Sequence, residues 1–136
     1  MGKDIHCTGI SGSLRRESFT THLLNRQVTL LPAAVATEII LIADLPLYNA
    51  DLDIAASKER PAAVTALKNK LATADGLMIV PPEYNCSMPG GLKNAIDWTS
   101  RGEDSPLSEK PVSVLGTATG FHMLCQFMNM KPVYKS

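Results

Sequence analysis

The hydrophobic residues of the chain follow two alternating periodicities. Short, nearly continuous apolar runs are typical of strands covered on both faces, and four such runs occur, at residues 5–8, 37–43, 76–80 and 111–115. Between them, apolar residues recur every three or four positions, as in amphipathic helices, at residues 18–31, 61–74 and 89–100. The pattern therefore predicts the element order β-α-β-α-β-α-β.

Each predicted helix has an apolar face and a plausible boundary. Pro32 ends the first helix, and Pro61 lies in the first turn of the second. The inward-facing residues of the first helix are Phe19, Leu23, Leu24, Val28 and Leu31. Those of the second are Val64, Leu67 and Leu71. Further along, the pattern predicts a short apolar helix at 121–130 and an edge strand at 131–134.

The alternation of strands and helices also predicts the topology. Strands that are separated by helices pair in parallel through right-handed crossovers. The result is an α/β fold, an open parallel sheet with helices on both faces. In such sheets, ligands bind beyond the carboxyl ends of the strands, where the strand order reverses. A binding site is therefore expected in the loops after Thr8, Val80 and Leu115.

Length and composition narrow the class of protein. With 136 residues, 45% of them hydrophobic and 19% charged, the chain fits one globular domain, residues 1–136. Thirteen basic and thirteen acidic residues give no net charge, which argues against a nucleic-acid-binding protein and an acidic electron carrier. Three cysteines without a CxxC pair, no secretory leader and no long apolar segment indicate a cytoplasmic protein without a membrane association.

The first candidate loop, residues 9–20, joins a strand to the N-terminus of a helix. Free amide groups and the positive end of the helix dipole favour an anion there. Arg15 or Arg16 can add a charge-assisted hydrogen bond. Hydroxyl donors come from Ser11, Ser13, Ser18 and Thr20. This many donors suit a terminal phosphate monoester, and the alternative is an ordinary turn in which Ser18 caps the helix.

Two further loops are expected at the same edge of the sheet. In the second loop, residues 81–91, Tyr84 can pack against a flat heteroaromatic ring such as an isoalloxazine, while Asn85 and backbone amides address its carbonyls and nitrogens. The third loop, residues 116–120, is small and bears hydroxyls, and it can hold the pyrimidine edge of the same ring. The alternative for the second loop is a crossover connection without chemical significance. The alternative for the third loop is a short turn.

The histidines and cysteines are scattered along the chain. They form neither a nucleophile–base arrangement nor the spacing of a metal site. These residues are His6, His22, His122, Cys7, Cys86 and Cys125. We therefore expect no catalytic protein side chain and no metal.

Several motifs taken together resemble those of a known family. They are Gly12-Ser13-Leu14-Arg15 with Ser18-Phe19, Pro82-Glu83-Tyr84-Asn85, the stretch 89–98, and Ser100-Arg101, with a further match at 43–49. From residue 5 to about residue 120, the chain resembles the NAD(P)H-dependent FMN reductase family, and most closely its bacterial chromate and quinone reductase branch.

The resemblance implies a flavodoxin-like fold of strand order 2-1-3-4-5 with FMN held non-covalently. It implies phosphate binding by Ser13, Arg15, Ser18, Phe19 and Thr20. It implies contacts to the flavin ring from Pro82, Glu83, Tyr84, Asn85 and Thr117. Family members are commonly homodimers or homotetramers with flavin sites near the subunit interface, and Arg101 is similar to a residue placed there, near the substrate.

The implied activity is that of an oxidoreductase that uses NADPH or NADH. Hydride passes to flavin N5, and two electrons pass on to a small-molecule acceptor: a quinone, a free flavin, an azo compound or an oxidised metal ion such as chromate. Family members continue through a further strand and a last helix, so this chain is expected to be a shortened member without that helix. The alternatives are a flavodoxin-like FMN-binding electron carrier and a non-catalytic remnant.

Overall fold

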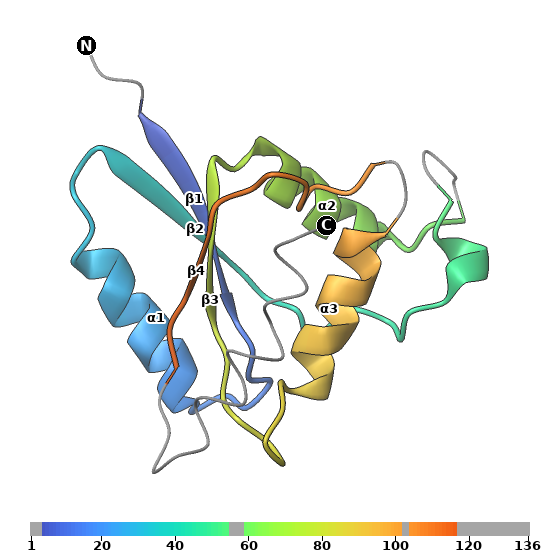
Figure 1. The fold of residues 1–136 in the computed structure, drawn as a ribbon, viewed down its shortest axis with the longest axis horizontal. Helices are drawn as coiled ribbons and strands as arrows, with labels where there is room; N and C mark the ends of the chain where they lie inside the picture. Colours follow the sequence, from blue (N-terminus) through green and yellow to red (C-terminus); the bar gives the residue numbers. More distant parts are fainter. Residues whose placement is uncertain (1–3, 55–58, 102–103, 117–136) are drawn as a thin grey trace.

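The computed structural model describes residues 4–54, 59–101 and 104–116, and it contains an open parallel sheet (Figure 1). Its strands are β1 (Ile5–Ser11), β2 (Val35–Ile40), β3 (Gly76–Val80) and β4 (Val112–Val114). All pairs are parallel, in the order β2-β1-β3-β4. The predicted fold class is confirmed, and the four strands follow the first four positions of the predicted strand order 2-1-3-4-5. The helix and strand predicted at 121–130 and 131–134 lie outside the described residues.

Helices cover both faces of the sheet (Figure 1). They are α1 (Phe19–Thr29), α2 (Ala62–Thr73) and α3 (Gly90–Ser100), with a short 3₁₀ helix, η1 (Ala50–Leu52), that the apolar pattern did not predict. Figure 1 shows α1 on one side of the sheet and α2 with α3 on the other. Within the described ranges, every helix is too short or too polar to cross a lipid bilayer.

The two faces of the sheet bury two hydrophobic clusters. The larger one joins the sheet to α2 and α3, and it includes Ile10, Leu67, Leu71, Leu77, Ile79, Leu92 and Ile96. The smaller one lies under α1 and contains Leu24, Met78 and Val80. Successive residues of β3 alternate between the two clusters, as the twofold periodicity of a strand requires. Because both of its faces are covered, β3 is buried along its whole length, as its continuous apolar sequence predicted.

Strand β1 is longer than predicted, because Gly9 does not end it. Gly9 lies opposite Ile39 of β2 and Met78 of β3, in the middle of the sheet. A methyl group on Gly9 would lie 3.0 Å from the Cδ1 atom of Leu24 in α1. The glycine therefore allows α1 to pack closely on the strand, and Ser11 is the last residue of the strand rather than part of the loop.

Two expectations about apolar residues were wrong. Phe19, predicted on the inner face of the first helix, is 77% exposed, because at that end the buried face of α1 carries Thr20 and Leu24. Strand β2 begins two residues and ends three residues earlier than predicted, since its pairing with β1 begins at Val35, and Leu41 beyond its end is exposed. The residues predicted to face inward from α2, in contrast, are all buried: Val64, Leu67 and Leu71.

Candidate functional site

Buried hydroxyl groups gather where β1 leads into α1. Thr20 Oγ1 lies 2.8 Å from Ser18 Oγ and 3.3 Å from Ser11 Oγ. Ser11 Oγ also lies 2.8 Å from the Oγ1 atom of Thr21, a residue that the sequence analysis did not single out. Ser11, Ser18 and Thr20 are buried. Three of the predicted site residues therefore form one connected cluster at the end of the first strand.

The N-terminus of α1 keeps the features that an anion requires. Ser18 is the N-cap residue, but its side chain bonds to Thr20 and not to a backbone amide of the first turn. The first turn contains no acidic residue. Ser13 and Arg15 lie in the loop just before it, where the amide of Arg15 donates to Ser13 Oγ at 3.3 Å. The uncapped amides and the hydroxyl groups together form a donor set that fits a phosphate monoester.

The first and second candidate loops lie side by side. The amide of Gly12 donates to the carbonyl of Val80 at 3.0 Å, which ties the end of β1 to the end of β3. A methyl group on Gly12 would lie 3.0 Å from the Cα atom of Pro81. A methyl group on Gly91 would lie 3.1 Å from the Leu14 side chain. One cofactor can therefore contact both loops, as the topology predicted.

The second loop is shaped by a tight turn. Tyr84 and Ser87 exchange two backbone hydrogen bonds, of 3.2 and 3.1 Å. The two residues between them, Asn85 and Cys86, have positive φ angles of 53° and 58°, as a type I′ turn requires. Tyr84 is 53% exposed, so its ring is accessible for packing against a planar ligand. Pro82 and Glu83 precede the turn and are partly buried.

The two remaining predicted site residues are Thr117 and Arg101. Thr117 lies outside the described residues. Arg101 follows the last residue of α3, whereas the second loop leads into the first residue of that helix. Since a helix rises about 1.5 Å per residue, the eleven residues of α3 separate the two by about 16 Å. Within one chain, the structure does not bring Arg101 to the two loops.

Arg101 instead lies beside aromatic residues that the sequence analysis did not select. Its guanidinium carbon is 5.1 Å from the centre of the Tyr48 ring, a cation–π arrangement. The Tyr48 ring meets Trp98 edge-on, with centroids 4.9 Å apart. The Trp98 indole donates to the carbonyl of Pro46 at 2.8 Å, and the amide of Tyr48 donates to Asn94 Oδ1 at 2.8 Å. The segment before η1 is thereby docked on α3.

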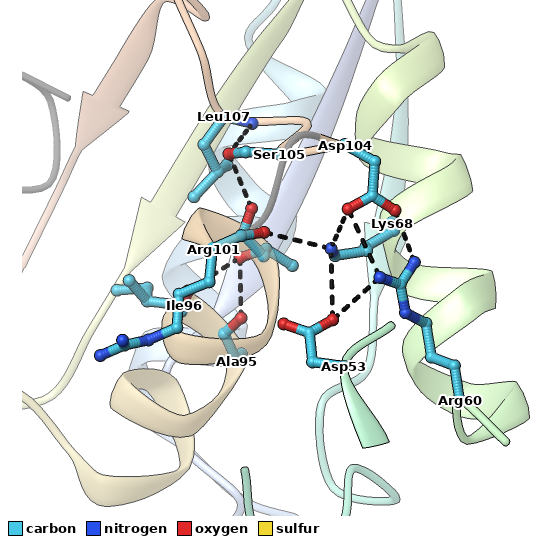
Figure 2. Close-up of polar contacts among 10 residues, drawn as sticks. Asp53, Arg60, Lys68, Ala95, Ile96, Arg101, Asp104, Ser105 and Leu107 are labelled. Atoms are coloured by element: carbon cyan, nitrogen blue, oxygen red, sulfur yellow. Dashed lines mark hydrogen bonds and ion pairs between the residues drawn. The ribbon is translucent and has the colours of Figure 1, made fainter. Parts of the chain in front are cut away.

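A second polar cluster lies near the C-terminal end of α3 (Figure 2). We call it the charge cluster, and it consists of Asp53, Arg60, Lys68 and Asp104. Arg60 is 2.9 Å from Asp53 and also pairs with Asp104. Lys68 is 2.7 Å from Asp104 and 3.6 Å from Asp53. The side chains of Asp53, Arg60 and Lys68 are almost fully buried, and that of Asp104 is 36% exposed.

These contacts shift the ionisation of both partners. Hydrogen bonds from Arg60 and then Lys68 lower the pKa of Asp104 from its usual 3.8 to about 2. The hydrogen bond to Asp104 raises the pKa of Arg60, so this guanidinium stays charged. Arg60 and Asp104 are therefore both ionised at neutral pH.

The lowered pKa of Asp104 predicts a loss of stability in acid. The folded state holds this carboxyl ionised more strongly than the unfolded state does, so its contribution is complete above pH 4 and is lost as the pH falls towards 2. Because the group is partly exposed, we expect this contribution to be only about 1 kcal/mol. Urea unfolding of the wild type and of Asp104→Asn measures it: the difference between the two should shrink between pH 5, about one unit above the usual pKa, and pH 2.5, which lies within the transition. A difference that stays constant with pH would contradict the prediction.

Comparisons with known proteins connect this arrangement to flavin enzymes. Residues 5–135 match the sequence profile of a family described as NADPH-dependent FMN reductase. The chain is 42% identical over 120 residues to an NAD(P)H-dependent FMN reductase of Pseudomonas aeruginosa. It is also 42% identical over 121 residues to a quinone reductase of Escherichia coli. Both matches cover 88% of this chain and 63% of the relative, so the chain spans less than two thirds of the length of these curated proteins.

A solved structure shows the same fold. The flavoenzyme NAD(P)H:(acceptor) oxidoreductase FerB of Paracoccus denitrificans superimposes with a TM-score of 0.82 and is 32% identical in sequence. The match covers 95% of this chain and 70% of FerB. The flavodoxin-like arrangement expected from the sequence is therefore confirmed by the sheet and by this neighbour.

Proposed function

Because the chain belongs to the NADPH-dependent FMN reductase family, we propose that it is an FMN-dependent oxidoreductase that transfers electrons from NAD(P)H to a small-molecule acceptor. Quinones are the acceptor class that the name of the Escherichia coli relative suggests. The observation that supports the proposal is the contact between the two candidate loops, one of which leads into the N-terminus of α1 and the other of which carries the exposed Tyr84.

The first loop would hold the phosphate of FMN. Ser13 and Arg15 lie in the approach to α1, and the buried hydroxyl groups of Ser11, Ser18 and Thr20 lie at its start. These groups supply neutral donors, while Arg15 supplies a charged and bidentate one. Phe19, exposed at the first position of α1, would cover the neighbouring part of the cofactor.

The second loop would hold the flavin ring. The tight turn at Asn85 and Cys86 fixes the backbone after Tyr84, so the exposed tyrosine side chain starts from a defined position. Pro82, Glu83, Tyr84 and Asn85 would form this wall of the site, and Thr117 is the further ring contact that the family resemblance implies. When bound, FMN supplies the redox chemistry, because its ring can accept a hydride and return two electrons. The protein binds and orients the reactants, and no side chain is needed as acid or base.

The proposal includes a cytoplasmic homodimer or homotetramer. Cys7 is a free thiol, in agreement with a reducing compartment. Arg101 is too far from the two loops of its own chain to act there. We therefore assign it to the edge of the site of a second copy, where its exposed guanidinium faces the acceptor.

An absorbance spectrum of the full chain tests the proposed function. Protein mixed with FMN and freed of excess cofactor should show the absorption bands of a bound flavin. These bands should bleach under anaerobic conditions when NADPH or NADH is added, and they should return when 1,4-benzoquinone is supplied. Protein that does not retain FMN would contradict the proposal, and bound flavin that NAD(P)H cannot reduce would favour an electron carrier.

A further inference from the structure

Lys68 is a buried cation whose contacts all lead away from its own helix. Its side chain is 5% exposed although it belongs to α2, and its ammonium group donates to Asp104 at 2.7 Å. It also donates to the backbone carbonyl of Arg101 at 3.3 Å. Figure 2 shows the ammonium between the two carboxylates of the charge cluster, directed at this carbonyl. Burying a lysine is costly, so its geometry is set by these partners.

The carbonyl that Lys68 contacts lies at the end of α3. The last carbonyl groups of a helix have no partner within the helix, and the negative end of the helix dipole favours a cation. The last turn of α3, all of it within the described part of the chain, contains no basic residue. Lys68 of α2 provides that cation from outside and so fixes the backbone of Arg101.

The backbone of Arg101 sets the point from which its side chain reaches Tyr48 and Asp97. Arg101 has an extended conformation (φ −107°, ψ 158°) that directs the chain away from the helix. Its guanidinium lies over Tyr48 and is 3.9 Å from Asp97, which is itself paired with Lys93. With its side chain 58% exposed, Arg101 is held in place and still accessible.

We propose that Lys68 is a positioning residue for Arg101, and that the charge cluster exists to hold Lys68 against the Arg101 carbonyl. Asp104 and Asp53 direct the ammonium, and Arg60 balances the second carboxylate. This inference rests on the proposed function in one respect, the assignment of Arg101 to the electron acceptor. The positioning itself can be tested without any turnover.

The test removes the positioning group without leaving a buried charge unpaired. In the double variant Lys68→Met/Asp104→Asn, one positive and one negative charge disappear together, and the pair of Arg60 with Asp53 at 2.9 Å remains. Replacing a buried ion pair by uncharged groups is often nearly neutral for stability. We therefore expect a folded protein with unchanged affinity for FMN, measured by flavin fluorescence titration.

Two readouts report on Arg101. In the wild type, the Tyr48 ring should shift the NMR resonances of the Arg101 side-chain protons upfield. The variant Tyr48→Leu gives the chemical shifts of the same protons without the ring. In the double variant this shift should be lost. The KM for 1,4-benzoquinone should rise about three- to tenfold, the loss expected for one weakened hydrogen bond, while kcat stays within about twofold.

The matched control is Glu38→Gln/Lys70→Met, which removes an exposed ion pair between β2 and the same helix, α2. It should leave the ring shift and the KM as in the wild type. A ring shift that survives in Lys68→Met/Asp104→Asn overturns the inference. A lost shift with an unchanged KM supports the positioning and overturns the assignment of Arg101 to the acceptor. If the wild type binds no FMN, the proposed function fails, and the ring shift alone then decides whether Lys68 positions Arg101.

Discussion

Lys68→Met alone is expected to lower the free energy of unfolding by about 3–5 kcal/mol, the cost of breaking a buried ion pair by removing one partner. The substitution leaves Asp53 and Asp104 with Arg60 as their remaining cation in the charge cluster. Asp53 is almost fully buried, so water cannot compensate for the lost ammonium. Urea unfolding at pH 7 with the fluorescence of Trp98 as the signal measures the effect.

Two variants separate this electrostatic effect from the loss of packing. Lys70→Met, on the exposed side of the same helix, is expected to change stability by less than about 0.5 kcal/mol. Adding Asp104→Asn to Lys68→Met should restore most of the loss, because the remaining cluster is then neutral. If the double variant were as unstable as Lys68→Met, the unpaired charge would not be the cause.

Arg15→Ala is expected to weaken FMN binding by about 1.5–3 kcal/mol, or roughly ten- to a hundredfold, since a hydrogen bond from a charged group to the phosphate is lost. Arg15 is exposed in the loop before α1, so the substitution should leave the stability of the fold unchanged. Titration of the apoprotein with FMN, followed by quenching of flavin fluorescence, gives the affinity. Titration with riboflavin, which lacks the phosphate, should show no difference between variant and wild type.

Arg16→Ala is the matched control for this measurement, because Arg16 is the neighbouring residue and is also exposed. Its FMN affinity should remain near that of the wild type. The reverse result, a loss with Arg16→Ala only, would transfer the phosphate contact to Arg16. Unchanged affinity in both variants would remove arginine from the phosphate site.

The centre of the sheet could be predicted from the sequence because β3 is buried on both faces. The residues of β3 are continuously apolar and bounded by Asp75 and Pro81, which leaves one interpretation of this segment. The parallel order then follows from the intervening helices. The contact between the two loops follows as well, since the ends of neighbouring parallel strands meet at one edge. The buried hydroxyl groups of Ser11, Ser18 and Thr20 are in the loop that this reasoning selected.

The contacts around the end of α3 could not be predicted in this way. Asp53, Lys68 and Asp104 are far apart in the sequence, and a pattern of apolar residues says nothing about which charges meet. One signal was present: Lys68 lies four residues after Val64 and next to Leu67, on the buried side of α2. A cation at such a position requires anionic partners. The exposure of Phe19 was missed for a related reason, because hydrophobicity alone does not separate a core residue from one at a binding loop.

The docking of the segment before η1 on α3 gives the protein an intrinsic optical probe. Trp98 is the single tryptophan of the chain, it is fully buried, and its indole bonds to the carbonyl of Pro46. All tryptophan emission therefore arises from one site, and it should be blue-shifted relative to indole in water. If the segment Pro46–Tyr48 detached from α3, the indole ring would become exposed to water and its emission would move to longer wavelength. The sheet itself could stay intact.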